Sequence, residues 1–178
     1  LIMKDSANAI LMMSAKNEAD QNLPSVTQII KKGDVLPWLY EYAGVVPPHS
    51  RIMAGATGVG VNVTSPEPDA VVRKMPMLIN VGGKIYPSMI VENVRFVFGS
   101  KRIKVVANES GIKEILVNKS NGVPVNQNGE MYINYADPKK YVQMSVTELM
   151  SKDIDINKIQ NKMIVIGLDA AGLSVLKY

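Results

Sequence analysis

The apolar residues of this chain come in short runs that glycine, proline and polar residues separate. The longest unbroken run is Ala9-Ile10-Leu11-Met12-Met13, whereas a helix that spans a bilayer needs about 18 consecutive apolar residues. Short apolar runs between turn residues are typical of strands, and apolar residues spaced three or four apart are typical of helices. The pattern therefore predicts a globular fold of short strands and helices, with no membrane span between residues 1 and 178.

Strands are predicted where apolar residues run together or alternate with polar ones. The run at residues 9–14 is continuously apolar, which is typical of a strand buried on both faces. Further strands are predicted at residues 58–63, 71–81 (broken near Pro76), 103–107, 112–117 and 163–166. Gly82-Gly83 marks a tight turn. Asn128-Gly129 predicts a type I′ hairpin that leads into a strand at residues 131–135.

Helices are predicted at residues 36–42, 88–98 and 145–150. Each begins with a residue that suits a helix N-terminus, because Pro37 stands in a first turn and Ser88 and Ser145 are good N-caps. Ser145 also forms a capping box with Glu148. Gly44 and Gly99 follow the first two helices as stop signals.

Strands separated by helices and strands joined by tight turns are both present, so we expect parallel and antiparallel pairing together. The fold class is predicted to be α/β (or α+β), a mixed sheet with helices packed on it. A length of 178 residues suits a single domain. Residues 45–50, with Pro47-Pro48, are expected to be irregular. The sequence begins with Leu1, so we expect a fragment of a longer protein.

Positive charge is spread along the sequence. The chain has 20 Lys and Arg against 16 Asp and Glu, a formal net charge of +4. The densest basic groups are only pairs, at residues 31–32, 73–74, 101–102 and 139–140. A nucleic-acid surface usually clusters Lys and Arg among exposed aromatic residues. No stripe of that kind is expected here, and no nucleic-acid partner.

The chain has few side chains that could bind a metal ion or act in catalysis. The chain has no Cys and a single histidine, His49, so carboxylates would have to complete any zinc or iron site. No G-x-S-x-G sequence marks a nucleophilic serine. Residues 167–172 resemble a phosphate loop, but Leu173 stands where the lysine should be. Residues 55–60 lead into a strand rather than a helix, which excludes a Rossmann site. We therefore predict no catalytic residue, no metal and no cofactor.

Five sequence blocks in order between residues 58 and 173 resemble one known family. The first is GVGVNV at residues 58–63, followed by PEPDAVVRKMPML at 66–78. The others are YPSMIVE at 86–92, MYINY at 131–135, SVTELM at 145–150 and KMIVIGLDAAGL at 162–173. They are similar to the blocks of the type-2 CHASE domain, the cyclase/histidine-kinase-associated sensory extracellular family. Ala70 departs from the glycine of that family, and Glu67 departs from its first aspartate.

The resemblance implies an extracytoplasmic signal-sensing domain, on the periplasmic or cell-surface face of a bacterial membrane. Flanking membrane helices would connect residues 1–178 to an adenylate or guanylate cyclase, a histidine kinase or a Ser/Thr kinase. The segment itself would not be an enzyme. Its partners would be a small-molecule or protein signal and a second copy in a homodimer. Two alternatives stay open: a small α/β hydrolase or transferase that uses Asp69, Arg73 and Glu92, and a purely structural dimerisation module.

A ligand site is expected where polar loops follow strand ends, because ligands of open α/β sheets bind beyond the carboxyl ends of the strands. If the strands at residues 58–63 and 163–166 are neighbours, six side chains could converge on one concave surface: Asn62, Asp69, Arg73, Tyr86, Ser88 and Asp169. A structural reading is also open. Arg73 can tie its strand to Asp69 through a charge-assisted hydrogen bond, and Ser88 can cap a helix.

Overall fold

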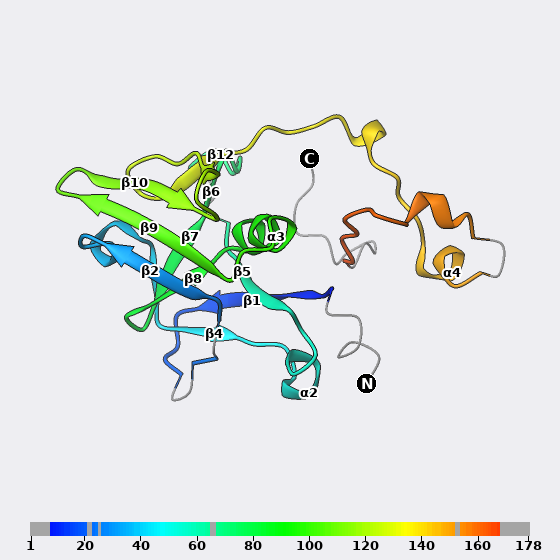
Figure 1. Cartoon of the computed structure of the whole chain (residues 1–178), viewed down its shortest axis with the longest axis horizontal. Helices are drawn as coiled ribbons and strands as arrows, with labels where there is room; N and C mark the ends of the chain where they lie inside the picture. The colour runs from blue at the N-terminus through cyan, green and yellow to red at the C-terminus, as the bar shows by residue number, and fades with distance from the viewer. Residues whose placement is uncertain (1–7, 21–22, 25, 65–66, 152–153, 168–178) are drawn as a thin grey trace. The chain divides into compact units, whose positions relative to one another are not determined.

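The computed structural model describes residues 8–20, 23–24, 26–64, 67–151 and 154–167. The chain divides into two compact units, Leu1–Asn134 (unit 1) and Tyr135–Tyr178 (unit 2), which are treated separately below (Figure 1). Within the described residues, no helix combines the length and the apolar character that crossing a bilayer requires.

Unit 1 is built mainly of short strands. Its strands are β1 (Ile10–Lys16), β2 (Gln28–Lys32), β3 (Glu41–Tyr42), β4 (Gly44–Val46), β5 (Gly58–Asn62), β6 (Lys74–Pro76), β7 (Leu78–Val81), β8 (Lys84–Pro87), β9 (Arg102–Asn108), β10 (Gly111–Leu116), β11 (Gly122–Val123) and β12 (Glu130–Tyr132). Its helices are the 3-10 helix η1 (Leu36–Trp38), α2 (Ser50–Met53) and α3 (Met89–Val97). The strand orders are β4-β1-β5, β11-β10-β9-β2, β12-β6 and β3-β7-β8.

The sheets mix parallel and antiparallel pairing, as the sequence predicts. Strand β1 pairs in parallel with β5, and β2 pairs in parallel with β9. The β7–β8 and β9–β10 pairs are antiparallel hairpins. Gly82 and Gly83 join β7 to β8 with φ angles of 54° and 82°, the left-handed pair of conformations that a two-residue I′ turn requires. The predicted α/β class with a mixed sheet is confirmed.

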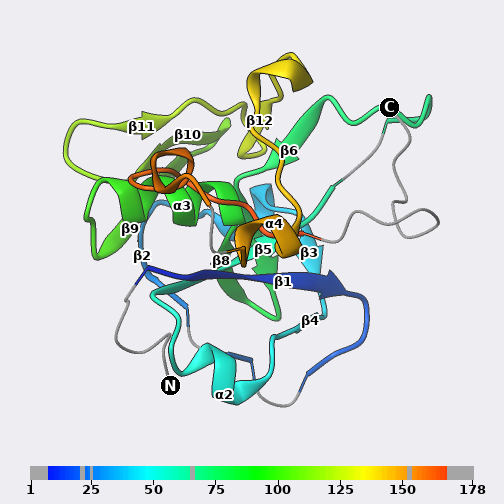
Figure 2. The ribbon, with the colours of Figure 1, turned by 90° about the vertical axis from the view of Figure 1, so that its right-hand side faces the viewer.

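The core lies on both faces of the β7–β8 hairpin, which lies in the middle of unit 1 (Figure 1; β8 is also labelled in Figure 2). Leu78 and Ile85 point to one side, where they join the cluster beneath β9 and β10. Ile79, Val81 and Tyr86 point to the other side, where they pack against β1 and β5. Successive strand residues face opposite ways, so one hairpin supplies both clusters. Full burial of each Leu or Ile side chain stabilises the fold by about 1.5–3 kcal/mol.

Helix α3 packs closely against β5. A Cβ atom built on Gly60 would overlap the backbone of Met89, and one built on Gly58 would overlap the carboxylate of Glu92. Those two glycines therefore allow the close approach of strand and helix. The helix begins at Ser88, whose Oγ accepts from the Val91 N–H at 3.3 Å, and the predicted N-cap is confirmed.

Two predictions for residues 36–50 are wrong. Only the 3-10 helix η1 forms in place of the helix predicted at residues 36–42. Leu39 is extended (φ −97°, ψ 145°), and residues 41–42 pair with β7. Residues 45–50, expected to be irregular, begin inside β4, which pairs with β1. Strand pairing with distant residues decided both segments.

The first predicted strand forms, but its two faces are not both buried. Met13 is 1% exposed, whereas the neighbouring Met12 is 48% exposed. The apolar cluster lies on one face of the β4-β1-β5 sheet. On the other face α3 covers β5 at Gly58 and Gly60 but leaves Met12 of β1 exposed, so the continuous apolar run of residues 9–13 does not correspond to burial on both faces.

The predicted type I′ hairpin at Asn128-Gly129 is also wrong. Gly129 has a φ of 71°, but Asn128 does not have a positive φ, and a type I′ turn needs both. Strand β12 instead pairs with β6, through Met131 opposite Met75. The pairing partner lies far away in the sequence, which the local turn signal did not indicate.

Unit 2 contains η2 (Pro138–Lys140), α4 (Val146–Leu149) and η3 (Ile156–Lys158). Ser145 Oγ accepts from the Glu148 N–H at 3.1 Å, so the predicted N-cap of α4 is confirmed. The predicted buried strand at residues 163–166 is wrong: these residues form no strand, and their exposed fractions run from 52% at Ile164 to 82% at Ile166. The described part of unit 2 has no strand with which this apolar run could pair.

Candidate functional site

A tight turn before β6 organises the predicted site residues Asp69 and Arg73. The Ala70 N–H donates to Glu67 O at 2.8 Å, and the Glu67 N–H donates to Val71 O at 3.1 Å. Ala70 has a φ of 64°, the left-handed conformation that glycine adopts without strain. The turn therefore tolerates alanine at a position that favours glycine, at a cost in backbone strain.

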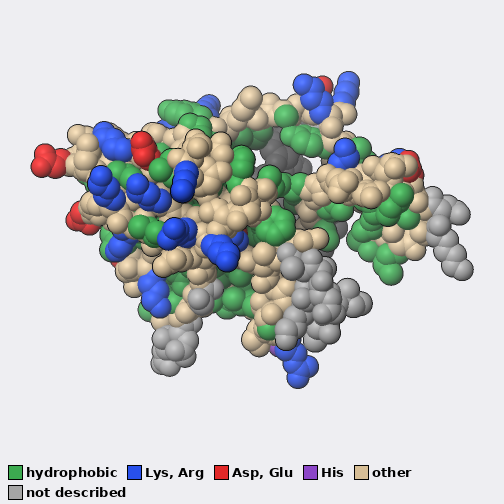
Figure 3. Space-filling view, in the orientation of Figure 1, with side chains coloured by type: hydrophobic (Ala, Val, Ile, Leu, Met, Phe, Trp, Pro, Cys, Tyr) green, Lys and Arg blue, Asp and Glu red, His purple; other side chains and the backbone are tan. Residues whose placement is uncertain are grey.

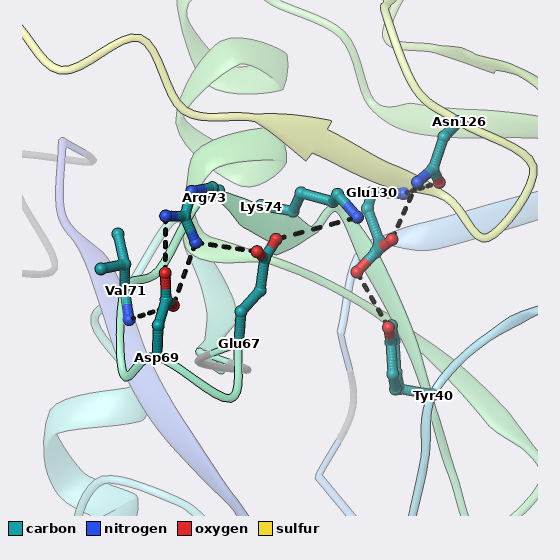
Figure 4. Close-up of polar contacts among 8 residues, drawn as sticks. All are labelled: Tyr40, Glu67, Asp69, Val71, Arg73, Lys74, Asn126 and Glu130. Carbon is teal, nitrogen blue, oxygen red and sulfur yellow. Dashed lines mark hydrogen bonds and ion pairs between the residues drawn. The ribbon is translucent and has the colours of Figure 1, made fainter.

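Arg73 ties this turn to the start of β6 (Figure 4). Its Nη2 donates to Asp69 Oδ2 at 2.7 Å, and its Nη1 donates to Asp69 Oδ1 at 3.0 Å and to Glu67 Oε2 at 2.8 Å. These hydrogen bonds from Arg73, helped by the Val71 N–H, lower the pKa of Asp69 to about 2. The Asp69 carboxylate in turn raises the pKa of Arg73. The expected bond between Arg73 and Asp69 is confirmed.

The charges of this turn balance one another. Lys74 Nζ lies 4.0 Å from Glu67 Oε1 and 5.4 Å from the centre of the Tyr132 ring, over the ring face. Two acids thus face two bases, and both oxygens of Asp69 already accept hydrogen bonds. A ligand that bound here would have to displace internal ion pairs.

The other predicted site residues lie in different surroundings. Tyr86 is 0% exposed and its hydroxyl donates to Pro24 O at 2.7 Å, while burial raises its pKa. Ser88 is buried at the start of α3. Asn62 is exposed at the end of β5, next to the bridge between Val61 and Ser88. Asp169 lies outside the described residues. The structure brings Asp69 and Arg73 together, and a ligand-binding role for the six residues stays a prediction.

A buried carboxylate that sequence reasoning missed belongs to Glu130. It is 6% exposed, and its two oxygens accept from Tyr40 Oη at 2.9 Å and from Asn126 Nδ2 at 2.8 Å (Figure 4). Burial, together with the Glu130 hydrogen bond, raises the pKa of Tyr40. Both oxygens are satisfied, so this cluster holds β12 in place rather than offering a reactive group.

A second buried charge is Glu92, which is 0% exposed. Arg95 donates to it twice, from Nη2 at 2.7 Å and from Nε at 3.0 Å, and Thr27 Oγ1 donates at 2.6 Å. The alternative of a hydrolase or transferase places Glu92 in one site with Asp69 and Arg73. In the structure Glu92 is enclosed within the core, whereas Asp69 and Arg73 lie on an exposed turn.

The outer face of the β11-β10-β9-β2 sheet is basic, which sequence reasoning also missed. A cavity of about 550 Å³ lies there, and Arg102, Lys104 and Lys119 are among its lining residues. The missed signal is the alternation of Arg102-Ile103-Lys104-Val105, because alternate residues of a strand share a face. Basic residues that are dispersed in the sequence thus gather in space.

The described residues contain no group of three or more His, Cys, Asp or Glu side chains that could hold a metal ion.

Comparison with known proteins gives one match. A family model described as the CHASE2 domain matches residues 2–178, essentially the whole chain. No curated protein and no solved structure matches.

Proposed function

This chain belongs to the CHASE2 domain family, and we propose that it is the signal-sensing part of a membrane-bound signal-transduction protein. CHASE2 domains are extracytoplasmic sensory domains of signalling proteins and are not catalytic themselves. The observation that carries the proposal is the family match over residues 2–178. The proposed output is a nucleotide cyclase, a histidine kinase or a Ser/Thr kinase in another part of the protein.

The proposed location is the periplasmic or cell-surface face of the membrane. The chain has no Cys, so a single introduced cysteine can be labelled without background from this segment. We expect Glu109→Cys, at an exposed turn after β9, to react with a membrane-impermeant maleimide in intact cells that carry the full-length protein. The matched control is Met13→Cys, because Met13 is 1% exposed and should stay unlabelled. Labelling of position 109 only after lysis would contradict an extracytoplasmic location.

Signalling is tested in the full-length protein. Gly60→Val drives a side chain into the backbone of Met89 and so displaces α3 from β5. We expect the output activity of this variant to stop responding to changes in the medium, while the output domain keeps its basal turnover in detergent. The control is Ala54→Val, at an exposed residue that follows α2. A response that persisted in Gly60→Val at normal protein levels would count against a sensory role for this segment.

The proposed partners are a small-molecule or protein signal and a second copy of the chain. In a homodimer, a conformational change in one sensor segment could alter how the two copies are arranged. Sedimentation velocity of the purified chain tests this directly: a dimer is expected at micromolar concentration, and a monomer over the whole accessible range would exclude the homodimer.

A further inference from the structure

The solvent side of the four-stranded β11-β10-β9-β2 sheet has an unusual distribution of charge. In the register of this sheet, Lys104 lies between Ile30 of β2 and Leu116 of β10, and Arg102 lies opposite Gln28 of β2. Their neighbours Ile103 and Val105 point into the core and are 0% exposed. Arg102 and Lys104 therefore stand on the same outward face, about 7 Å apart along the strand.

A cavity of about 550 Å³ opens on this face. Lys119, in the turn between β10 and β11, adds a third cation to its lining, next to Asn118. Asn118 Oδ1 accepts from two backbone N–H groups of that turn, at 2.9 Å and 2.7 Å, so the turn that carries Lys119 is held by local hydrogen bonds. Ile30 and Leu116 supply apolar surface beside the cations. Figure 3 shows Lys and Arg side chains gathered over the region where Figure 1 places β2, β9 and β10.

Some basic side chains of unit 1 have an acidic partner, and others, with these three cations among them, have none within the described residues. Lys16, Arg73, Lys74 and Arg95 each form an ion pair within unit 1. None of the three cations at the cavity forms an ion pair with any residue that the structure describes.

One acid shares the outward face. Glu114 is exposed and lies opposite Val106, two residues along β9 from Lys104. It does not belong to the lining of the cavity. The lining itself therefore carries three positive charges and no negative one.

We propose that this cavity binds a small organic anion that carries at least two acidic groups, carboxylate or phosphate. The guanidinium of Arg102 suits bidentate binding of either group, and Lys104 and Lys119 supply point charges for a second. A volume of about 550 Å³ lies within the range of about 300–1,000 Å³ that small-molecule sites occupy. Ile30 and Leu116 would contact the carbon body of the ligand. A flat membrane surface suits the exposed cations less well, because it cannot enter a concave site.

The ligand class rests on the proposed sensory role, since the anion would be the sensed signal. Binding itself is measured on the purified 178-residue chain, whereas the sensory role is measured by the response of the full-length protein. A failure of binding would therefore remove this site and leave the sensory role standing.

The experiment uses citrate and inorganic pyrophosphate as probes, with acetate as the anion that has only one acidic group. Isothermal titration calorimetry and thermal shift in low-salt buffer compare the wild type with Arg102→Gln/Lys104→Gln. The matched control, Arg51→Gln/Lys84→Gln, removes the same charge outside the cavity: Arg51 lies in α2 and Lys84 in β8. Circular dichroism verifies that both variants fold.

We expect citrate or pyrophosphate to bind the wild type more tightly than acetate does. Affinity should fall at least about tenfold in Arg102→Gln/Lys104→Gln and stay within about twofold in the control, and added salt should weaken binding because the charges are exposed. Three results would each overturn the proposal: no binding of either probe, equal affinity in wild type and cavity variant, or an equal loss in the control. Vesicles that contain phosphatidylglycerol form a further arm. Binding to these vesicles without binding of soluble probes would identify a membrane contact instead and would also overturn the proposal.

Discussion

Replacing Arg95 by methionine isolates the energetic role of the buried ion pair. Glu92 is 0% exposed and Arg95 is 7% exposed, so neither charge is screened by water. In Arg95→Met the Glu92 carboxylate keeps the Thr27 hydrogen bond but loses two hydrogen bonds from Arg95. Breaking a buried pair from one side costs about 3–5 kcal/mol, because the remaining charge is uncompensated. That is a large part of the roughly 5–15 kcal/mol by which domains are stable.

Urea denaturation measures this cost. With a slope of about 2–3 kcal/mol per molar, a loss of about 3–5 kcal/mol lowers the midpoint by about 1–2.5 M at unchanged slope. The double variant Glu92→Gln/Arg95→Met should be more stable than Arg95→Met alone, because it leaves no charge in the core. Arg73→Met is the control, since its ion pair with Asp69 is exposed, and it should change the midpoint much less. A shift below about 0.3 M in Arg95→Met, or a double variant no more stable than the single one, would contradict this role of the buried ion pair.

Three further perturbations test other parts of the structure. Ala70→Gly should raise stability by up to about 1 kcal/mol, because it relieves a left-handed φ of 64°; a lower urea midpoint would contradict this. Gly60→Ala should lower stability by about 1–3 kcal/mol or more through its overlap with the Met89 backbone. Gly122→Ala should cost clearly less in the same assay, because its Cβ would lie 3.3 Å from the Leu116 side chain and 3.7 Å from Ile115 O. Asp69 has a pKa of about 2 in the folded state against a usual 3.8, so its contribution is complete above pH 3.8 and is lost as the pH falls toward 2. A pH series of urea midpoints should show this acid loss in the wild type and a smaller one in Arg73→Met.

Several features could be predicted from the sequence because they depend on a few neighbouring residues. The cap at Ser88, the Gly82-Gly83 turn and the bond between Asp69 and Arg73 each join groups no more than four residues apart. In such cases the backbone conformation and one side chain decide the outcome without help from the rest of the fold.

The pairing of strands could not be read from local patterns. The predicted helix at residues 36–42 gives way to β3, because β7 offers hydrogen-bond partners about forty residues away. Residues 163–166 have the apolar pattern of a core strand but form none. An apolar pattern indicates that burial of a segment would be favourable. Whether the segment forms a strand also depends on whether the fold places a partner strand beside it.

Neighbouring residues are enough to predict the α/β class, the caps at Ser88 and Ser145, the Gly82-Gly83 turn and the family blocks, because composition, short-range sterics and local hydrogen bonds act between residues that are close in the chain. Which charges are buried and which lie together on one face depends on how distant segments pack in the folded chain. Glu92 meets Thr27 across a separation of 65 residues, and Lys119 joins Arg102 and Lys104 through the fold of the β9-β10-β11 strands. The interaction between two charges depends on the distance between them. For residues far apart in the chain, folding sets that distance and also decides whether water reaches the side chains.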